Sequence, residues 1–164
     1  MNGYQILEML KQKPDVAQLV AGIWCGDALK LKCIFPPYYP CVFIVNTNSF
    51  TNVNMTPGHW VVFHFKRNQQ DAEFFCSGGL SPVMYPEHFE AFLLRHAQTY
   101  TYNCQPLQDP ASCVCGLYAL MYIHAIHKGY NVKEYVDMNF TCDLKVNDQL
   151  VKSYINKEWS IFNY

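Results

Sequence analysis

The 164-residue sequence contains little charge, and the charge it has is almost balanced. Only 15% of the residues are charged, and 12 basic against 13 acidic side chains give a formal net charge of -1. This balance argues against a chain built to coat nucleic acid or an anionic membrane. Hydrophobic residues make up 51%, which excludes a disordered chain. No apolar run reaches the roughly 18 residues that a membrane span needs, so the sequence predicts a soluble protein.

The sequence also lacks the marks of secretion and of structural zinc. The amino-terminal segment MNGYQILEMLKQKPD has no basic region followed by an apolar stretch, so we expect a reducing, intracellular compartment. No C-x-x-C pair occurs among the 8 cysteines, so we expect no metal, and no cofactor is implied. Most of the following six cysteines are interpreted as small hydrophobic residues of the core: Cys25, Cys33, Cys41, Cys104, Cys113 and Cys142.

Repeats, low-complexity tracts and linkers are absent, so residues 1–164 are predicted to form a single domain. Helices are expected within the first 20 residues, with Ile6, Leu7 and Leu10 on one face, and over 86–97, 115–127, 132–138 and 146–155. Strands are expected over 41–45, 59–65, 73–76 and 100–104, the second and third paired as a hairpin. This order predicts an α+β fold in which a small mixed β-sheet packs against helices.

The sharpest local feature is Cys115, which begins the most helical segment of the chain and is followed by Gly116. The amino-terminal end of a helix carries partial positive charge and unpaired N–H groups. A thiol there ionises more easily, and the N–H groups can hold an oxyanion. Gly116 leaves room for a substrate backbone. Cys113 is a weaker rival, because it precedes the helix.

A thiol nucleophile also needs an imidazole that accepts its proton. Of the 6 histidines, four lie on helical stretches and read as surface or ordinary core residues. His59 and His64 lie on opposite faces of one strand, because their separation is odd. His59 begins the strand directly after Pro57 and Gly58, whereas His64 lies inside it and is interpreted as structural. Cys76 ends the neighbouring strand, where an orienting carboxylate would be sought.

Three segments in the correct order resemble the adenovirus maturation protease family, adenain, within the clan of ubiquitin-like-protein cysteine proteases. Val45-Asn46-Thr47, followed by residues 58–65, resembles the histidine strand of that family. Residues 74–81 resemble its acid-bearing strand and turn, and residues 108–118 resemble its glutamine and nucleophile segment. The resemblance covers about residues 20 to 128, with a weaker match around 137–139.

The resemblance implies a papain-like cysteine protease core of the adenain type. It implies His59 as the general base, Cys115 as the nucleophile and Gln108 as the side-chain donor to the oxyanion. The substrate-binding residues expected beside them are Gly58, Trp60 and Gly116.

The sequence departs from that family at the acid position, where Cys76 stands 17 residues after His59. Glu73 has the wrong strand parity to replace the missing carboxylate, and Asp71 lies before the strand. A Cys–His dyad oriented by water or backbone, a slow enzyme and an inactive one all remain open. Activation by DNA is not carried over to this near-neutral chain. Cys104 does not match the position that would link an activating peptide, so that partner stays open.

The resemblance favours a virus-encoded or virus-derived cysteine endopeptidase that cleaves capsid or core precursor proteins at Gly-containing sites through an acyl-enzyme thioester. The expected partners are polypeptides, without nucleic acid or membrane, in the host nucleus or the virion. Two alternatives remain: a protease of the same clan that acts on ubiquitin or a ubiquitin-like modifier, and a catalytically impaired binding module that keeps the fold.

Overall fold

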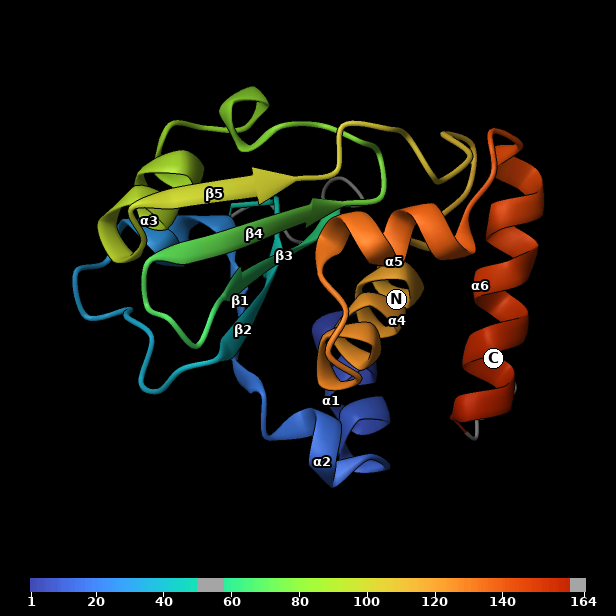
Figure 1. The fold of residues 1–164 in the computed structure, drawn as a ribbon, viewed down its shortest axis with the longest axis horizontal. Helices are drawn as coiled ribbons and strands as arrows, with labels where there is room; N and C mark the ends of the chain where they lie inside the picture. Colours follow the sequence, from blue (N-terminus) through green and yellow to red (C-terminus); the bar gives the residue numbers. More distant parts are fainter. Residues whose placement is uncertain (50–57, 160–164) are drawn as a thin grey trace.

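The computed structural model describes residues 1–49 and 58–159. Figure 1 shows a twisted sheet whose two faces are covered by helices. The strands are β1 (Val20–Cys25), β2 (Cys41–Asn46), β3 (Trp60–Phe65), β4 (Asp71–Cys76) and β5 (Thr99–Tyr102). The helices are α1 (Gly3–Lys11), α2 (Pro14–Ala17), α3 (His88–His96), α4 (Cys115–His127), α5 (Val132–Asn139) and α6 (Leu144–Glu158), with short 3-10 turns η1 (Gly26–Lys30) and η2 (Pro82–Met84).

The five strands form one mixed sheet in the order β1-β2-β3-β4-β5. The central strands β2, β3 and β4 are antiparallel to one another, whereas β1 and β5 are added in parallel at the two edges. The predicted α+β class and the β3–β4 hairpin are therefore confirmed. The edge strand β1 was not predicted, because Val16, Leu19 and Val20 fit a helical period and the strand is only half-buried.

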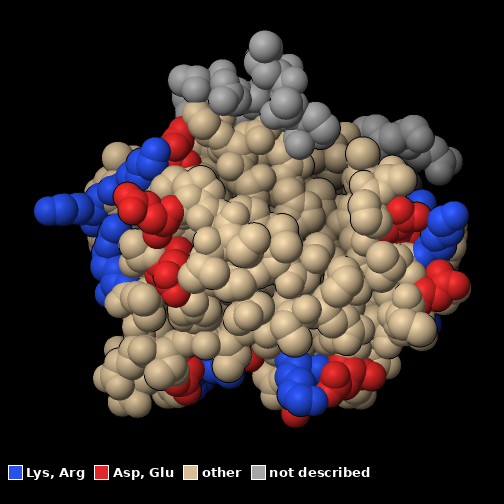
Figure 2. Space-filling view, turned by 90° about the horizontal axis from the view of Figure 1, so that it is seen from above, with Lys and Arg blue, Asp and Glu red and all other residues tan. Residues whose placement is uncertain are grey.

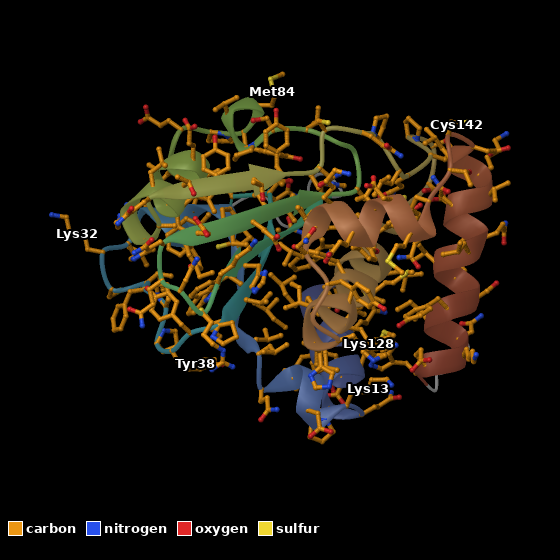
Figure 3. All side chains as sticks on the ribbon, in the orientation of Figure 1. Lys13, Lys32, Tyr38, Met84, Lys128 and Cys142 are labelled. Atoms are coloured by element: carbon orange, nitrogen blue, oxygen red, sulfur yellow. The ribbon has the colours of Figure 1, made fainter. Side chains whose placement is uncertain are left out.

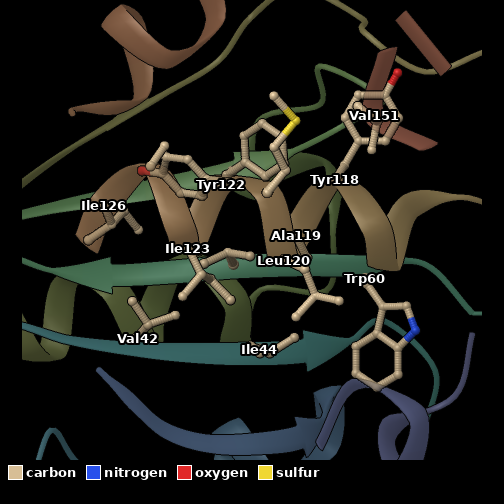
Figure 4. Packing of buried hydrophobic residues seen from close by; sticks show 14 of the residues in the cluster. Val42, Ile44, Trp60, Tyr118, Ala119, Leu120, Tyr122, Ile123, Ile126 and Val151 are labelled. Carbon is tan, nitrogen blue, oxygen red and sulfur yellow. The ribbon is translucent and has the colours of Figure 1, made fainter. Parts of the chain in front are cut away.

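Helix α4 lies at the centre of the larger core, against β3 and between the sheet and α6. Its bounds agree with the prediction, and eleven of its thirteen residues are buried because it is apolar on every side. Figure 4 shows Leu120 and Ile123 packed over Val42 and Ile44 of β2, with Trp60 beneath the amino-terminal end of the helix. The first residue of α4 is thereby fixed by the core itself.

The other face of the sheet is covered by α3 and by a cluster of aromatic rings. Phe43, Phe63 and Phe65 project from the sheet onto Phe92 of α3, with ring centroids 5.4 to 5.6 Å apart. Edge-to-face pairs of this kind add to the apolar burial. On α3 itself, Phe89, Phe92 and Leu93 are fully buried. In α1 the buried residues are Ile6, Met9 and Leu10, whereas Leu7 is exposed.

The interpretation that most of those six cysteines are core residues is wrong. Of that set only Cys41 is buried, Cys25 is half-buried, and the other four are exposed. The exposed cysteines lie in loops and at element ends, where apolar neighbours in sequence do not produce burial; Figure 3 shows Cys142 at the outer end of α6. No described cysteine is paired in a disulfide.

None of the described helices is both long and apolar enough to cross a membrane. Among residues 1–49 and 58–159, no three His, Cys, Asp or Glu side chains are grouped as a metal site would require.

Candidate active site

His59 is held at the entrance to β3 by two hydrogen bonds with Thr47. The Thr47 N–H donates to the His59 carbonyl at 2.8 Å, and the His59 N–H donates to Thr47 Oγ1 at 3.0 Å. At Gly58 an added β-carbon would overlap Asn46 Oδ1, so a larger residue would require the Asn46 side chain to move. Pro57, the other residue singled out in front of His59, lies outside the described residues.

Cys76 ends β4 beside His59, and its sulfur lies 3.4 Å from His59 Nε2. The backbone of Cys76 is locked by Asn103, whose Oδ1 accepts from the Cys76 N–H at 2.9 Å and whose Nδ2 donates to the Cys76 carbonyl at 2.6 Å. The thiol therefore occupies the orienting position that the sequence spacing predicted. Because Nε2 faces Cys76, Nδ1 is the ring nitrogen left to serve a nucleophile. Burial lowers the pKa of His59, so its imidazole is neutral near pH 7.

Cys115 is the first residue of α4, where the N–H groups of the first turn lack helical partners. Burial raises the pKa of the Cys115 thiol. The backbone N–H groups of Trp60 and Gly116 and the charged amino terminus act in the opposite direction. Burial thus favours the neutral thiol of Cys115 and the neutral imidazole of His59 over a thiolate and an imidazolium.

Gln108 is joined to the end of β4 by a second set of bonds. Its Oε1 accepts from the Ser77 hydroxyl at 2.6 Å, and the Ser77 carbonyl accepts from the N–H groups of Leu107 and Gln108 at 2.8 and 3.1 Å. The Gln108 amide donates to Ser112 at both the carbonyl, 2.9 Å away, and the hydroxyl, 3.2 Å away. Gln108 is thus fixed beside the nucleophile segment, with its N–H groups turned toward Ser112.

A cleft of about 690 Å³ brings most of the predicted residues together. His59, Gln108 and Cys115 line it, and so do Gly58 and Trp60. Its other described lining residues are Met1, Asn2, Gly3, Ile23, Trp24, Cys25, Asn46, Asn48, Pro110, Ser112 and Cys113. None of the described lining residues is Asp, Glu, Lys or Arg.

Two predicted residues lie just outside this wall. Cys76 is fully buried behind His59, and Gly116 faces the side chain of Met1, whose sulfur would be 2.9 Å from an added β-carbon. Met1 also accepts a 2.9 Å hydrogen bond from Trp60 Nε1 through its carbonyl. The amino-terminal residue therefore lies over the beginning of α4.

Sequence reasoning missed Tyr85, whose hydroxyl lies 3.1 Å from the sulfur of Cys76, and Asn103, which locks the Cys76 backbone. Both lie in irregular segments, where no hydrophobic period or motif marks them. In the sequence, Tyr85 is marked only as the residue that precedes the helix predicted from Pro86.

No protein-family model matches the sequence, and no curated protein matches it. Solved structures do match the fold. A crystal structure of selenomethionine ASFV pS273R protease aligns with a TM-score of 0.64 at 17% identity, covering 94% of this chain and 65% of that one. A second crystal structure of the ASFV protease aligns with a TM-score of 0.57 at 17% identity, covering 93% and 64%. ChlaDub1 from Chlamydia trachomatis aligns at 0.49 and 12% identity, covering 93% and 74%.

This likeness establishes the fold: the chain has a papain-like α+β fold, which the ASFV protease shares. The chain spans about 65% of the length of the ASFV protease. Fold alone does not assign chemistry, so the function rests on the side chains around the cleft.

Proposed function

We propose that this protein is a cysteine endopeptidase in which Cys115 is the nucleophile and His59 the general base. The observation that carries the proposal is the contact of His59 Nε2 with Cys76, which leaves Nδ1 for the cleft that Cys115 also lines. A thiol at the amino-terminal end of a buried helix and an imidazole oriented from behind form the arrangement that thiol proteases require.

The reaction begins when His59 Nδ1 accepts the proton of the Cys115 thiol. The sulfur then attacks the scissile carbonyl carbon, and the N–H groups at the start of α4 stabilise the oxyanion. Gln108 supplies a further donor when one of its N–H groups leaves Ser112 for the substrate oxygen. His59 returns the proton to the leaving amine, and water hydrolyses the thioester.

The proposed substrates are polypeptides with uncharged residues around the scissile bond. The described cleft wall carries no charged side chain that would pair with one on the substrate. Figure 2 shows a face of the molecule whose centre is free of Lys, Arg, Asp and Glu, which lie around its edges. Such a surface offers no electrostatic attraction to nucleic acid.

Within this class we favour a virus-encoded or virus-derived enzyme that processes precursor proteins at Gly-containing sites. The likeness to the ASFV protease and the resemblance to adenain support it. We further propose that residues 1–164 act as one catalytic domain, in the host nucleus or the virion. A short activating peptide is a further candidate partner. Ubiquitin-like modifiers are the competing substrates, because they share the catalytic apparatus.

The test is covalent labelling by a thiol-reactive electrophile carried on a peptide that ends in Gly-Gly, followed by mass spectrometry. We expect modification at Cys115 that is lost in Cys115→Ala and falls at least about a hundredfold in His59→Ala. Cys113→Ala, which removes a neighbouring exposed thiol, is the matched control and keeps the labelling.

A rate no greater than that of an exposed cysteine such as Cys142, with or without candidate peptide activators, would overturn the proposal and favour the binding-module alternative. Labelling by a modifier-derived probe in preference to the short peptide would instead assign the substrate to the ubiquitin-like class.

A further inference from the structure

The thiol of Cys76 has two polar neighbours among the described residues. His59 Nε2 lies 3.4 Å from the sulfur and the Tyr85 hydroxyl lies 3.1 Å from it. A carboxylate can only accept from an imidazole N–H, but a thiol has one hydrogen that it can donate in either direction. Either the thiol or the tyrosine hydroxyl can be the donor in the contact of Cys76 with Tyr85. Whether the thiol hydrogen points to His59 Nε2 or to Tyr85 determines which tautomer His59 adopts.

The two arrangements have opposite consequences for catalysis. If the Cys76 thiol donates to Nε2, the proton of neutral His59 lies on Nδ1, which then cannot accept the proton of Cys115. If the thiol donates to Tyr85, the sulfur accepts from Nε2–H and Nδ1 remains free. The second arrangement also supports the imidazolium that forms during the reaction, because both ring nitrogens are then donors.

Tyr85 is held firmly enough to act as this acceptor. Its ring stacks on Phe89 of α3 with centroids 5.2 Å apart and planes 21° apart, and it packs against Phe74 of β4 at 5.8 Å. Burial raises the pKa of Tyr85, so the hydroxyl is neutral at neutral pH. Within the described chain, Cys76 is the group that hydrogen-bonds to this hydroxyl.

We propose that Tyr85 is a positioning residue: it accepts the thiol hydrogen of Cys76, so that Cys76 and Tyr85 together replace the carboxylate that orients His59. This inference rests on the proposed function, since it explains how a site with cysteine at the acid position provides a general base.

The remaining titratable groups around His59 are few. Among the described residues, Cys25, Cys113 and Cys115 line the same cleft, and Cys76 and Tyr85 lie behind the ring. No described residue that lines the cleft is a carboxylate that could orient the imidazole. We therefore expect a substitution at Tyr85 to change the titration midpoint and the tautomer of His59.

The first experiment is a double-mutant cycle between Tyr85→Phe and Cys76→Asp, read as the rate of Cys115 labelling. We expect Tyr85→Phe to slow labelling about tenfold in the natural background. In the Cys76→Asp background we expect it to slow labelling less than about twofold, because a carboxylate accepts from Nε2–H without help from the hydroxyl. Tyr100→Phe, which removes a 2.6 Å hydrogen bond to Glu90 outside the cleft, is the matched control and leaves the rate unchanged.

The second experiment does not depend on catalysis. In Cys115→Ala protein, nuclear magnetic resonance of the His59 ring gives its titration midpoint and its tautomer. We expect Tyr85→Phe to lower the midpoint by about half a pH unit and to increase the Nδ1–H form. An unchanged His59 signal, or equal losses in both backgrounds of the cycle, would overturn the role of Tyr85. If His59 responds as expected while natural protein does not label, the protease proposal fails and the positioning of His59 stands.

Discussion

Strands β3 and β4 carry two histidine sites that differ in the strength of the partner. His64 Nδ1 lies 3.0 Å from a carboxylate oxygen of Glu73, whereas His59 Nε2 lies 3.4 Å from the sulfur of Cys76. The pair of His64 and Glu73 faces α4 and lies in the core, where Glu73 is 1% exposed. Glu73 also accepts from Tyr122, Lys66 and the Val132 N–H, so we interpret this pair as stabilising the fold.

The weaker pair lies at the cleft that Cys115 lines. The hollow that His64 lines has no cysteine, serine or threonine among its described residues. Under the proposed function, access to a nucleophile distinguishes the catalytic histidine, and a buried carboxylate partner does not.

The largest expected effect separates the two histidines directly. His59→Gln is expected to slow labelling of Cys115 by about a hundredfold to ten-thousandfold, because the general base is removed, with little change in unfolding free energy. His64→Gln is expected to keep the labelling rate and to lower the unfolding free energy by about 1–2 kcal/mol, because a hydrogen bond to a buried carboxylate is lost. Labelling kinetics and urea denaturation measure both. Similar losses of reactivity in the two variants would abolish the distinction.

The next effect concerns acid stability. Burial on its own raises the pKa of Glu73, but the hydrogen bonds from His64, Tyr122 and Lys66 together outweigh it and lower the pKa to about 2. A depressed carboxyl pKa stabilises the folded state above the unfolded value near 4.5, and this stabilisation is lost as the pH falls toward 2. We expect a loss of about 3 kcal/mol across that window, measured by urea denaturation at a series of pH values. A profile equally steep in Glu73→Gln would assign the loss to other groups.

A smaller effect is expected for Glu73→Gln at neutral pH. The amide has the shape of the carboxylate, but its NH₂ group faces donors rather than acceptors. We therefore expect the unfolding free energy to fall by about 2 kcal/mol, with Cys115 labelling intact. The control is Glu90→Gln, which removes one carboxylate that accepts from Tyr100 in a partly exposed position. Equal stability of the two variants would show that the Glu73 network contributes no more than a partly exposed hydrogen bond.

The smallest effect is a gain. Cys76→Asp restores a carboxylate behind His59 and is expected to accelerate Cys115 labelling about tenfold, because an anion supports the imidazolium better than a neutral thiol does. Cys76→Ser keeps a neutral hydrogen-bonding group of similar size and is expected to give no such gain. If serine accelerates labelling as much as aspartate, hydrogen bonding rather than charge limits the natural site.

Much of this architecture is predictable because it follows from local rules. The bounds of α4 follow from an apolar run that ends at Gly129, and the β3–β4 hairpin follows from two apolar segments around a polar turn. The position of Cys76 beside His59 follows from its spacing on that hairpin, and the structure confirms it.

The rest depends on contacts between distant loops. Tyr85 and Asn103 reach Cys76 from segments whose sequence shows no period, so their partners are visible only in the folded chain. Strand β1 was missed because its first residue, Val20, also fits the helical period of Val16 and Leu19, and because Gly22 interrupts its apolar run VAGIWC. The exposure of four cysteines was not predicted, because the burial of a thiol depends on the elements packed around it and not on its own hydrophobicity.

The burial of α4 also has a consequence for the mobility of Cys115, the first residue of this helix. The amide hydrogens of a helix enclosed on all sides exchange with solvent mainly when the whole domain opens, whereas those of edge elements such as β5 exchange through small local fluctuations. We therefore expect Cys115 to be attached to the slowest-exchanging part of the molecule. A peptide should then change deuterium uptake in the loops around the cleft more than in α4.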